Sequence, residues 1–435
     1  MTRFAPAFLI LSWVIMGFSF AFWVPLAWDW WGEGGRNLRI WLGSFGLTFF
    51  TGLWLWWRTR RHAAELTVRD GFLLVNLVWL VLPAYAAVPL WFTVPGIGVV
   101  QAYFEAMSGL TATGATSLAG LDVLATSINI WRCFLQLIGG LGIMLLALAV
   151  LPFLGLGGLQ IFKAEMPGPM KDSRLTPRIA ETARGMWGVY FVLSVACLLA
   201  YRAGGMSWAD AFMHMCTTVG LGGLSSHDQS FAFWGSPQLE WTAVLFMALA
   251  GVSFARYFLL WQLRSLAPLT RDAEVRAYVT VLLLASAGVA AMLITHDVYE
   301  DFPSAVRHAA FQVVSVATTT GYSIGDYLTW PTFVPVLLLF LGSFVSCAGS
   351  TGGGIKMVRM LVLVRLASGL DVVTAFSAVI ANVNNIGPGM GRIGPAGNYA
   401  SFTDPQLALC ALAMVLGRLE LLSMLVLFTP AFWRR

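Results

Sequence analysis

Four segments of fourteen residues can be laid over one another so that each ends on glycine, and they carry the residue types of an ion-binding loop. They are QAYFEAMSGLTATG (101–114), DAFMHMCTTVGLGG (210–223), HAAFQVVSVATTTG (308–321) and TAFSAVIANVNNIG (374–387). Each has alanine second, an aromatic residue third or fourth, and hydroxyl or amide residues shortly before the glycine. Because four segments would not share one pattern by chance, the repeat predicts four copies of one loop around one pore.

The end of each segment has the chemistry of a site for a dehydrated monovalent cation. Glycine allows a positive φ and carries no side chain, so successive carbonyl oxygens can point into a narrow axis. Rings of such oxygens replace the hydration shell of the cation. In the second segment Gly220, preceded by Thr218 and Val219, is an alternative to Gly223. The predicted filter residues are Ala112, Thr113, Gly114, Leu221, Gly222, Gly223, Thr319, Thr320, Gly321, Asn385, Ile386 and Gly387.

The composition indicates the elements that must position these loops. The chain is 58% hydrophobic and only 11% charged, which predicts an all-α polytopic membrane protein. A membrane barrel would instead show ten-residue alternation. Runs long enough to cross the hydrocarbon core are 4–28, 38–57, 71–92, 128–154, 185–201, 239–263, 277–294, 331–347 and 407–428. The first run is expected to be a mature helix rather than a signal peptide. The five cysteines are scattered through apolar stretches, as core residues are.

The charges predict an orientation. Basic clusters at 58–62, 163–184, 264–276 and 434–435 mark the cytoplasmic side, and the acidic, aromatic connections 29–33 and 296–301 mark the outside. The four glycine segments then begin from the outer side. Since the basic residues fall in short connections between helices, no nucleic-acid partner is expected.

The repeat divides the chain into an added N-terminal hairpin (1–70) and four pore repeats. These are 71–162, 163–268, 269–366 and a truncated fourth repeat at 367–435, and each complete repeat contains an outward helix, a short re-entrant helix, a glycine loop and an inward helix. The register glycines are 109 residues apart from 114 to 223, 98 from 223 to 321, but only 66 from 321 to 387. The fourth repeat is therefore short by about one helix and its loop.

Few other side chains suggest chemistry. Glu105 lies inside the first short helix in an apolar context, where a carboxylate is costly, and we expect a structural partner for it rather than direct ion binding. His214 and His308 also fall in the short helices, and packing is their expected role. Acidic residues near the outer mouth could raise the local cation concentration, although most are expected to be solvated loop residues. They are Asp122, Asp228, Asp301, Asp326 and Asp404.

The predicted gate is a glycine-rich interruption at 348–356 in the third repeat, where an apolar helix should cross the inner half of the membrane. Its main residues are Gly352, Gly353, Gly354 and Lys356. The order of residues fails the nucleotide P-loop pattern, because Ile355 separates the last glycine from the lysine. Arg418 lies within the last apolar run, where it costs about 2.5–3.5 kcal/mol unless it faces a cavity or a partner. We expect it to face the pore beside this gate.

With these residues in view, the chain resembles the Trk/Ktr/HKT superfamily of potassium uptake proteins, and closely its TrkH branch. The matching stretches are 104–116, 164–169 with 176–183, 347–356, 384–389 and 428–433. The resemblance implies a four-repeat channel-like fold, a homodimer, a cytoplasmic nucleotide-binding regulatory partner of the TrkA kind, and a gate at the glycine-rich loop. In that family glycine in all four filters goes with potassium preference and serine in the first goes with sodium, so Gly114 favours potassium.

One departure from the family concerns the fourth repeat, because members carry a cytoplasmic segment and an outward helix between the positions that match Arg365 and Ala367. Either residues 355–370 return outward from the broken loop or the fourth repeat is displaced, and we predict impaired or altered gating.

The expected function is passive potassium uptake across the inner membrane. A sodium-conducting or ion-coupled (K⁺/H⁺ or K⁺/Na⁺) secondary transporter is the alternative. No cofactor is expected. An enzyme has little support, since paired carboxylates, histidine clusters and nucleophile motifs are lacking.

Overall fold

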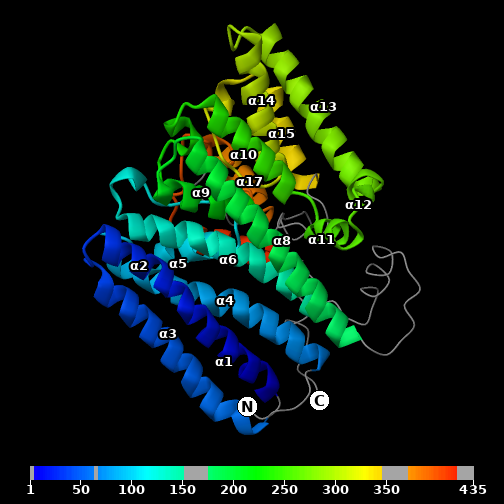
Figure 1. Ribbon diagram of the computed structural model, residues 1–435. Coiled ribbons are helices and arrows are strands. Elements are labelled where there is room, and N and C mark those ends of the chain that lie inside the picture. Colours follow the sequence, from blue (N-terminus) through cyan, green and yellow to red (C-terminus); the bar gives the residue numbers. More distant parts are fainter. Residues whose placement is uncertain (1–3, 63–66, 151–174, 345–370, 419–435) are drawn as a thin grey trace.

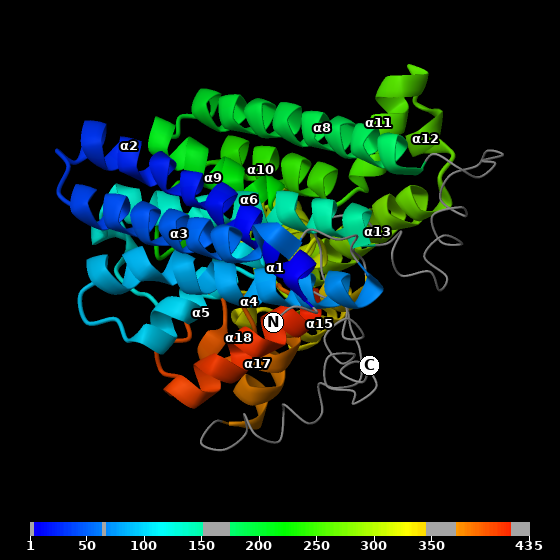
Figure 2. The ribbon, with the colours of Figure 1, turned by 90° about the horizontal axis from the view of Figure 1, so that it is seen from below.

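The computed structural model describes residues 4–62, 67–150, 175–344 and 371–418, and every regular element within these ranges is a helix (Figure 1). An N-terminal hairpin is formed by α1 (Ala5–Ser19), η1 (Phe20–Phe22), α2 (Trp23–Gly32) and α3 (Leu38–Thr59), which ends in η2 (Arg60–His62). At its turn the Asp29 carboxylate accepts the N–H of Asn37 at 3.2 Å. The hairpin lies against α4 and α6, as the blue helices of Figures 1 and 2 show.

The remaining helices repeat one order: a long helix, a short re-entrant helix and a second long or broken helix. The first unit is α4 (Val68–Thr93), α5 (Val99–Leu110) and α6 (Thr126–Val150). The second is α8 (Leu175–Ala203), α9 (Trp208–Val219), α10 (Pro237–Ala250), α11 (Phe254–Leu263) and α12 (Ala267–Thr270). The third is α13 (Ala273–Thr295), α14 (Phe302–Ala317) and α15 (Phe333–Phe344), and the fourth contributes α17 (Val372–Val383) and α18 (Asp404–Arg418). Short 3-10 turns follow the re-entrant helices at η3 (Leu121–Val123), η4 (Ser230–Phe233), η5 (Tyr327–Thr329) and η6 (Gly391–Ile393).

Three of the four re-entrant helices begin at a side-chain cap. Ser207, Asp301 and Asp371 accept the backbone N–H three residues later, at 3.0, 2.9 and 3.0 Å. A cap satisfies one of the N–H groups left free at a helix start, so each of these helices begins at a residue fixed by the sequence.

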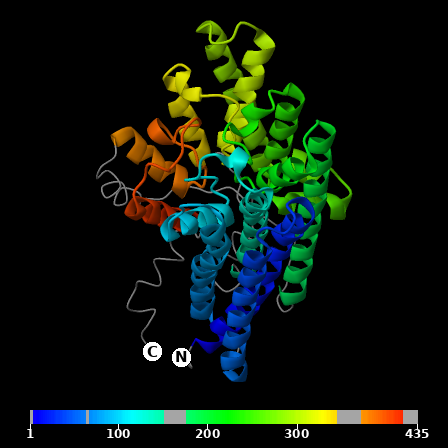
Figure 3. The same cartoon turned by 90° about the vertical axis from the view of Figure 1, so that its left-hand side faces the viewer.

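The units are arranged in a closed cycle. Each re-entrant helix packs against the last long helix of the preceding unit: α9 against α6, α14 against α10, α17 against α15, and α5 against α18. Figure 3 shows the cyan, green, yellow and orange segments meeting around one centre. The fourth unit is therefore in place, and the alternative of a displaced fourth repeat is wrong. The route taken by residues 355–370 lies outside the described residues.

The prediction of one uninterrupted span over 239–263 is wrong, because α10 and α11 meet at a bend of 82°. Two tyrosine hydroxyls stabilise the break by donating to carbonyls at the end of α10. Tyr278 reaches Ala248 at 3.0 Å, and Tyr257 reaches Leu249 at 2.8 Å. A Cβ at Gly251 would lie 2.2 Å from the Tyr278 hydroxyl, so the glycine makes room for this contact.

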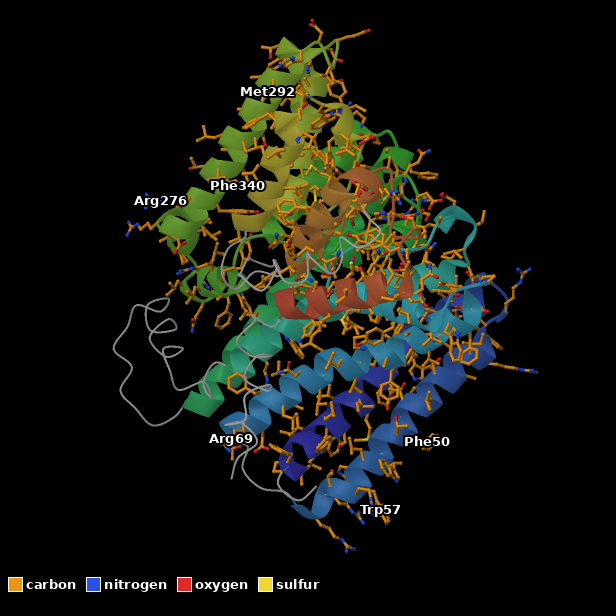
Figure 4. All side chains as sticks on the ribbon, turned by 180° about the vertical axis from the view of Figure 1, so that it is seen from behind. Phe50, Trp57, Arg69, Arg276, Met292 and Phe340 are labelled. Atoms are coloured by element: carbon orange, nitrogen blue, oxygen red, sulfur yellow. The ribbon has the colours of Figure 1, made fainter. Side chains whose placement is uncertain are left out.

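The outward faces of the long helices are apolar, as the bilayer requires. Among the described residues five helices are long and apolar enough to cross a membrane, or six if the bent pair is one span. Figure 4 shows Phe50 and Trp57 at the edge of the bundle and Phe340 on α15, and their exposed fractions are 66%, 58% and 60%. Arg276 and Arg69 mark the end of the molecule at which α13 and α4 begin.

Candidate functional site

The loops that follow the re-entrant helices share one unusual backbone conformation. We call residues 111–114, 220–223, 318–321 and 384–387 filter loops 1 to 4. In each loop the residue two before the register glycine has a positive φ: Ala112 (50°), Leu221 (51°), Thr319 (61°) and Asn385 (54°). The register glycines follow with φ of 81°, 68°, 87° and 87° at Gly114, Gly223, Gly321 and Gly387. A β-branched residue such as Thr319 rarely adopts this region, so the surrounding structure imposes the conformation.

The end of each re-entrant helix accounts for the first of these angles. In loop 1 the Thr113 N–H donates to the Ser108 carbonyl at 2.9 Å and the Ala112 N–H donates to Gly109 at 3.0 Å. This is a Schellman helix end, which requires a left-handed residue at the position of Ala112. The hydrogen bond that spans five residues recurs in the other three loops. The N–H groups of Gly222, Thr320 and Ile386 donate to the carbonyls of Thr217, Ser315 and Ala381, at 2.9, 2.8 and 2.8 Å.

The four loops close a ring, which we call the glycine ring. A Cβ added to Gly114 would lie 1.9 Å from the Gly222 oxygen, and one on Gly223 would lie 2.0 Å from the Thr320 oxygen. The cycle continues in the same way. A Cβ on Gly321 would lie 2.1 Å from the Ile386 oxygen, and one on Gly387 would lie 2.7 Å from the Thr113 oxygen. Each register glycine therefore lies against the carbonyl of the next loop, and a side chain at any of the four positions would collide with backbone.

The backbone also decides the register of loop 2. Gly220 ends α9 with right-handed helical angles (φ −72°, ψ −11°), whereas Gly223 has the positive φ found at Gly114 and Gly321. The structure therefore places Gly223, and not Gly220, at the position equivalent to the other register glycines.

A vestibule opens onto the glycine ring. It holds about 580 Å³ of unoccupied space that is open to solvent, and all four register glycines line it. Asp228 is the one acidic residue of the predicted outer group that lines it. Asp228 accepts the N–H groups of Gly120 and Leu121 at 2.9 and 3.1 Å, and thereby joins the segments that follow loops 1 and 2. Asp301 and Asp326 instead cap short helices.

A buried ion pair supports loop 1. Glu105 Oε2 lies 3.2 Å from Arg132 Nε, and both side chains are 0% exposed. The other carboxylate oxygen accepts the hydroxyls of Thr116 and Ser117 at 2.9 and 3.0 Å. Arg132 also donates to Thr116 Oγ1 at 2.8 Å. The expected structural partner of Glu105 is thus Arg132 on α6, a residue that no sequence pattern indicates.

The same register position supports two other loops. His214 aligns with Glu105, and its Nε2 lies 3.1 Å from Ser225 Oγ beyond loop 2. Gln312 also aligns, and its Nε2 donates to the Tyr322 carbonyl at 3.4 Å. A polar residue at the fifth position of the fourteen-residue repeat was the sequence signal for these supports. In the fourth segment that position is Ala378, and the neighbouring Ser377 receives the N–H of Met390 at 2.9 Å instead.

Hydroxyl groups fill the space between loops 2 and 3. The Tyr322 hydroxyl, directly after Gly321, contacts Thr217 Oγ1 and lies 3.1 Å from Thr218 Oγ1. Tyr201 on α8 lies 2.7 Å from that same Thr218 oxygen. Tyrosine and threonine thus tie the third loop to the helix that carries the second.

An ion pair at the vestibule joins the first and second units. His227 Nδ1 contacts Asp122 Oδ1, and His227 Nε2 lies 3.4 Å from Asp210 Oδ1. Burial lowers the pKa of His227, but the carboxylates of Asp210 and Asp122 outweigh it and leave the pKa raised. The hydrogen bond from His227 holds the pKa of Asp122 below its ordinary value. The imidazole also stacks on Phe233 with ring centres 3.5 Å apart.

Other predicted residues have simpler outcomes. His308 stacks on Tyr299 at 4.4 Å and contacts the Ser304 carbonyl, which fits its expected packing role. In the described part of the chain four cysteines are free and buried, namely Cys133, Cys197, Cys216 and Cys410. The described residues contain no group of three histidine, cysteine or acidic side chains that could hold a metal ion.

The predicted gate is not described by the structure. Gly352, Gly353, Gly354 and Lys356 lie outside the described residues. Arg418 is the last residue of α18, and its side chain is likewise outside them.

Comparison with known proteins finds relatives along most of the chain. Residues 40–370 match the family described as "TrkH: Cation transport protein". The "Trk system potassium uptake protein TrkH" of Salmonella typhimurium (strain LT2) is 39% identical over 90% of this chain and 92% of that protein. The "Trk system potassium uptake protein TrkG" of Escherichia coli (strain K12) is 32% identical over 92% of each. The crystal structure of the potassium transporter TrkH from Vibrio parahaemolyticus superimposes with a TM-score of 0.89 at 33% identity, covering 99% of this chain and 100% of that one.

Proposed function

Because the chain belongs to the TrkH family of cation transport proteins, we propose that it takes up potassium ions across the inner (cytoplasmic) membrane. Membership of this family makes it a transport protein and not an enzyme. The observation that carries the potassium proposal is the closed ring, in which every register glycine lies against a carbonyl of the next loop. Potassium is then the transported ion, and no cofactor takes part.

The ring supports this function through its backbone oxygens. Carbonyls of the four loops replace the water around the ion, with Ala112, Thr113 and Gly114 and their counterparts forming the filter. The re-entrant helices point their C-terminal ends at the ring, and that end of a helix dipole favours a cation. Glycine at all four register positions favours potassium over sodium. The vestibule, with Asp228 in its wall, is the entry to the ring.

The distribution of charge gives the direction of uptake. The basic residues near Arg58 and Arg276 face the cytoplasm, and the vestibule with the His227 ion pair faces the outside. A membrane potential that is negative inside then drives each potassium ion inward with about 2.3 kcal/mol per 100 mV. No coupled ion is needed for this flux.

Gating belongs to the same proposal. The glycine-rich segment around Gly352, Gly353, Gly354 and Lys356, together with Arg418, closes the path below the ring. A cytoplasmic nucleotide-binding subunit of the TrkA kind controls it, and the chain works as a homodimer in the lipid bilayer. The short fourth repeat lies next to this gate in the sequence, and we expect impaired or altered gating from it.

The test is ion flux in a bacterial strain that lacks its own potassium uptake systems. Expression of the full chain is expected to restore growth at low potassium and to bring in Rb⁺ in preference to Na⁺. Equal or preferential Na⁺ entry would support the sodium-conducting alternative. Uptake that follows an imposed proton or sodium gradient at zero membrane potential would support the ion-coupled alternative. Absence of any cation flux would overturn all three.

A further inference from the structure

Filter loops 1 and 3 have an internal support that loop 2 lacks. In loop 1 the hydroxyls of Thr111 and Thr113 lie 2.7 Å apart, and in loop 3 those of Thr318 and Thr320 lie 2.8 Å apart. The equivalent residues of loop 2 are Gly220 and Gly222. With Gly223 this loop has three glycines among four residues, so its backbone has the largest conformational freedom of the four.

A side chain from a neighbouring unit holds this loop instead. Gln136 lies on α6 and is fully buried. Its Nε2 donates to the Gly222 carbonyl at 2.8 Å, and its Oε1 accepts the N–H of Leu224 at 3.2 Å. One planar amide thus fixes the backbone on both sides of Gly223. Only one orientation of the amide satisfies both partners, because a carbonyl accepts and an N–H donates.

The contact between Gln136 and Gly222 leaves no room for another side chain. A Cβ at Gly222 would lie 2.3 Å from Gln136 Cδ. A side chain at residue 222 would therefore displace the Gln136 amide from this position.

The oxygen that Gln136 holds belongs to the glycine ring, since it is the Gly222 oxygen that faces Gly114 of loop 1. Selectivity among alkali ions depends on the position of such oxygens and on the strength of their dipoles. The hydrogen bond from Gln136 Nε2 restricts the position of the Gly222 oxygen and withdraws electron density from it. We propose that Gln136 is a positioning residue that sets the ion preference of the ring through Gly222. This inference rests on the proposed potassium uptake.

The experiment compares Rb⁺ and Na⁺ entry in the full chain and in Gln136→Met, expressed in a strain without its own potassium uptake systems. Methionine keeps the length and most of the volume of glutamine but makes neither bond. The Rb⁺/Na⁺ ratio is expected to fall about five- to tenfold, the effect of one typical hydrogen bond. The ratio is informative because a change in the open fraction of the channel alters both fluxes equally.

Gln101→Met is the matched control. Gln101 also donates its amide to a loop carbonyl, that of Ser117 at 3.1 Å, but this oxygen lies beyond the ring. Its Rb⁺/Na⁺ ratio is expected to stay at the wild-type value. A fall as large as that of Gln136→Met would assign both effects to general loosening and overturn the proposal.

A second variant, Gln136→Leu, guards against misfolding of the first. Leucine is close to methionine in volume and can make neither bond, so the ratio is expected to fall by a similar factor. A wild-type ratio in either variant overturns the proposal, as does failure of both to reach the membrane, which would assign Gln136 to folding. If the wild-type chain itself does not prefer Rb⁺ over Na⁺, the proposed function fails; if it does and Gln136→Met matches it, only this inference fails.

Discussion

The first three units and the fourth reach the same loop geometry with different support. In units one to three the re-entrant helix packs under a long helix, α4, α8 or α13. In unit four Val373 and Phe376 of α17 are 51% and 45% exposed among the described residues. The ring nevertheless closes through loop 4 with the same backbone angles. The conformation of a filter loop therefore follows its Schellman helix end and its ring neighbours.

The largest expected effect on transport comes from adding a side chain to the ring. Gly321→Ala places Cβ 2.1 Å from the Ile386 oxygen at a φ of 87°. Backbone strain of this kind is about 1–3 kcal/mol, so Rb⁺ uptake should fall by at least about 10- to 100-fold. Uptake of radioactive Rb⁺ by whole cells measures it. The matched control is Gly325→Ala, four residues after filter loop 3 ends, where the new Cβ meets nothing within 4 Å. Uptake retained in Gly321→Ala would contradict the idea that ring contacts fix the loops.

The next prediction compares how much stability two supports provide. One is the charged Glu105–Arg132 pair beside loop 1, and the other is the neutral Ser377 beside loop 4. Arg132→Met leaves the fully buried Glu105 without its partner, which should cost about 3–5 kcal/mol of stability. Ser377→Ala removes only neutral hydrogen bonds around Met390, at about 0.5–1.5 kcal/mol. Thermal unfolding of the purified protein in detergent compares the two. The double variant Glu105→Gln with Arg132→Met should recover part of the loss, and equal losses in the two single variants would argue against the comparison.

A smaller effect tests whether the outer face of α17 is free. Phe212 and Phe376 occupy the same register position, but Phe212 stacks near Trp28 and Phe134, with ring centres 5.9 and 6.1 Å apart. Phe212→Ala should therefore cost about 1–3 kcal/mol, whereas Phe376→Ala should stay within about 0.5 kcal/mol. The same thermal unfolding assay measures both. A large loss in Phe376→Ala would mean that another part of the chain, or a partner, covers this face.

The sequence was sufficient for the ring because four copies of one pattern align, and the alignment placed Gly223 correctly where a single motif favoured Gly220. It also predicted that Glu105 has a structural partner. It could not identify Arg132 or Gln136, because these lie on α6 and act on loops up to 88 residues away in the chain. The bend after Gly251 was missed for the same reason. Tyr278, one of the two residues that stabilise it, lies on α13, and the other, Tyr257, is part of the apolar run itself.

The smallest expected effect concerns the ion pair that joins units one and two, for which unit four has no described counterpart. The pKa of His227 is raised from 6.5, so its stabilising contribution is fully present below 6.5 and is lost as the pH rises through the raised pKa. The pKa of Asp122 is lowered from 3.8, so its contribution is present above 3.8 and is lost as the pH falls through the lowered pKa.

Unfolding temperature measured from pH 5 to 9 should therefore decline in the wild-type protein on the alkaline side. The decline should correspond to less than about 1 kcal/mol, because Asp122 is 43% exposed and solvent screens the pair. Asp210, which also faces His227, keeps its charge throughout this range because its pKa is lowered. His227→Gln should flatten the curve, and His296→Gln, at an exposed site away from these carboxylates, should leave it unchanged. A curve that declines equally in His227→Gln would place the titrating group elsewhere and remove this ion pair from the difference between the units.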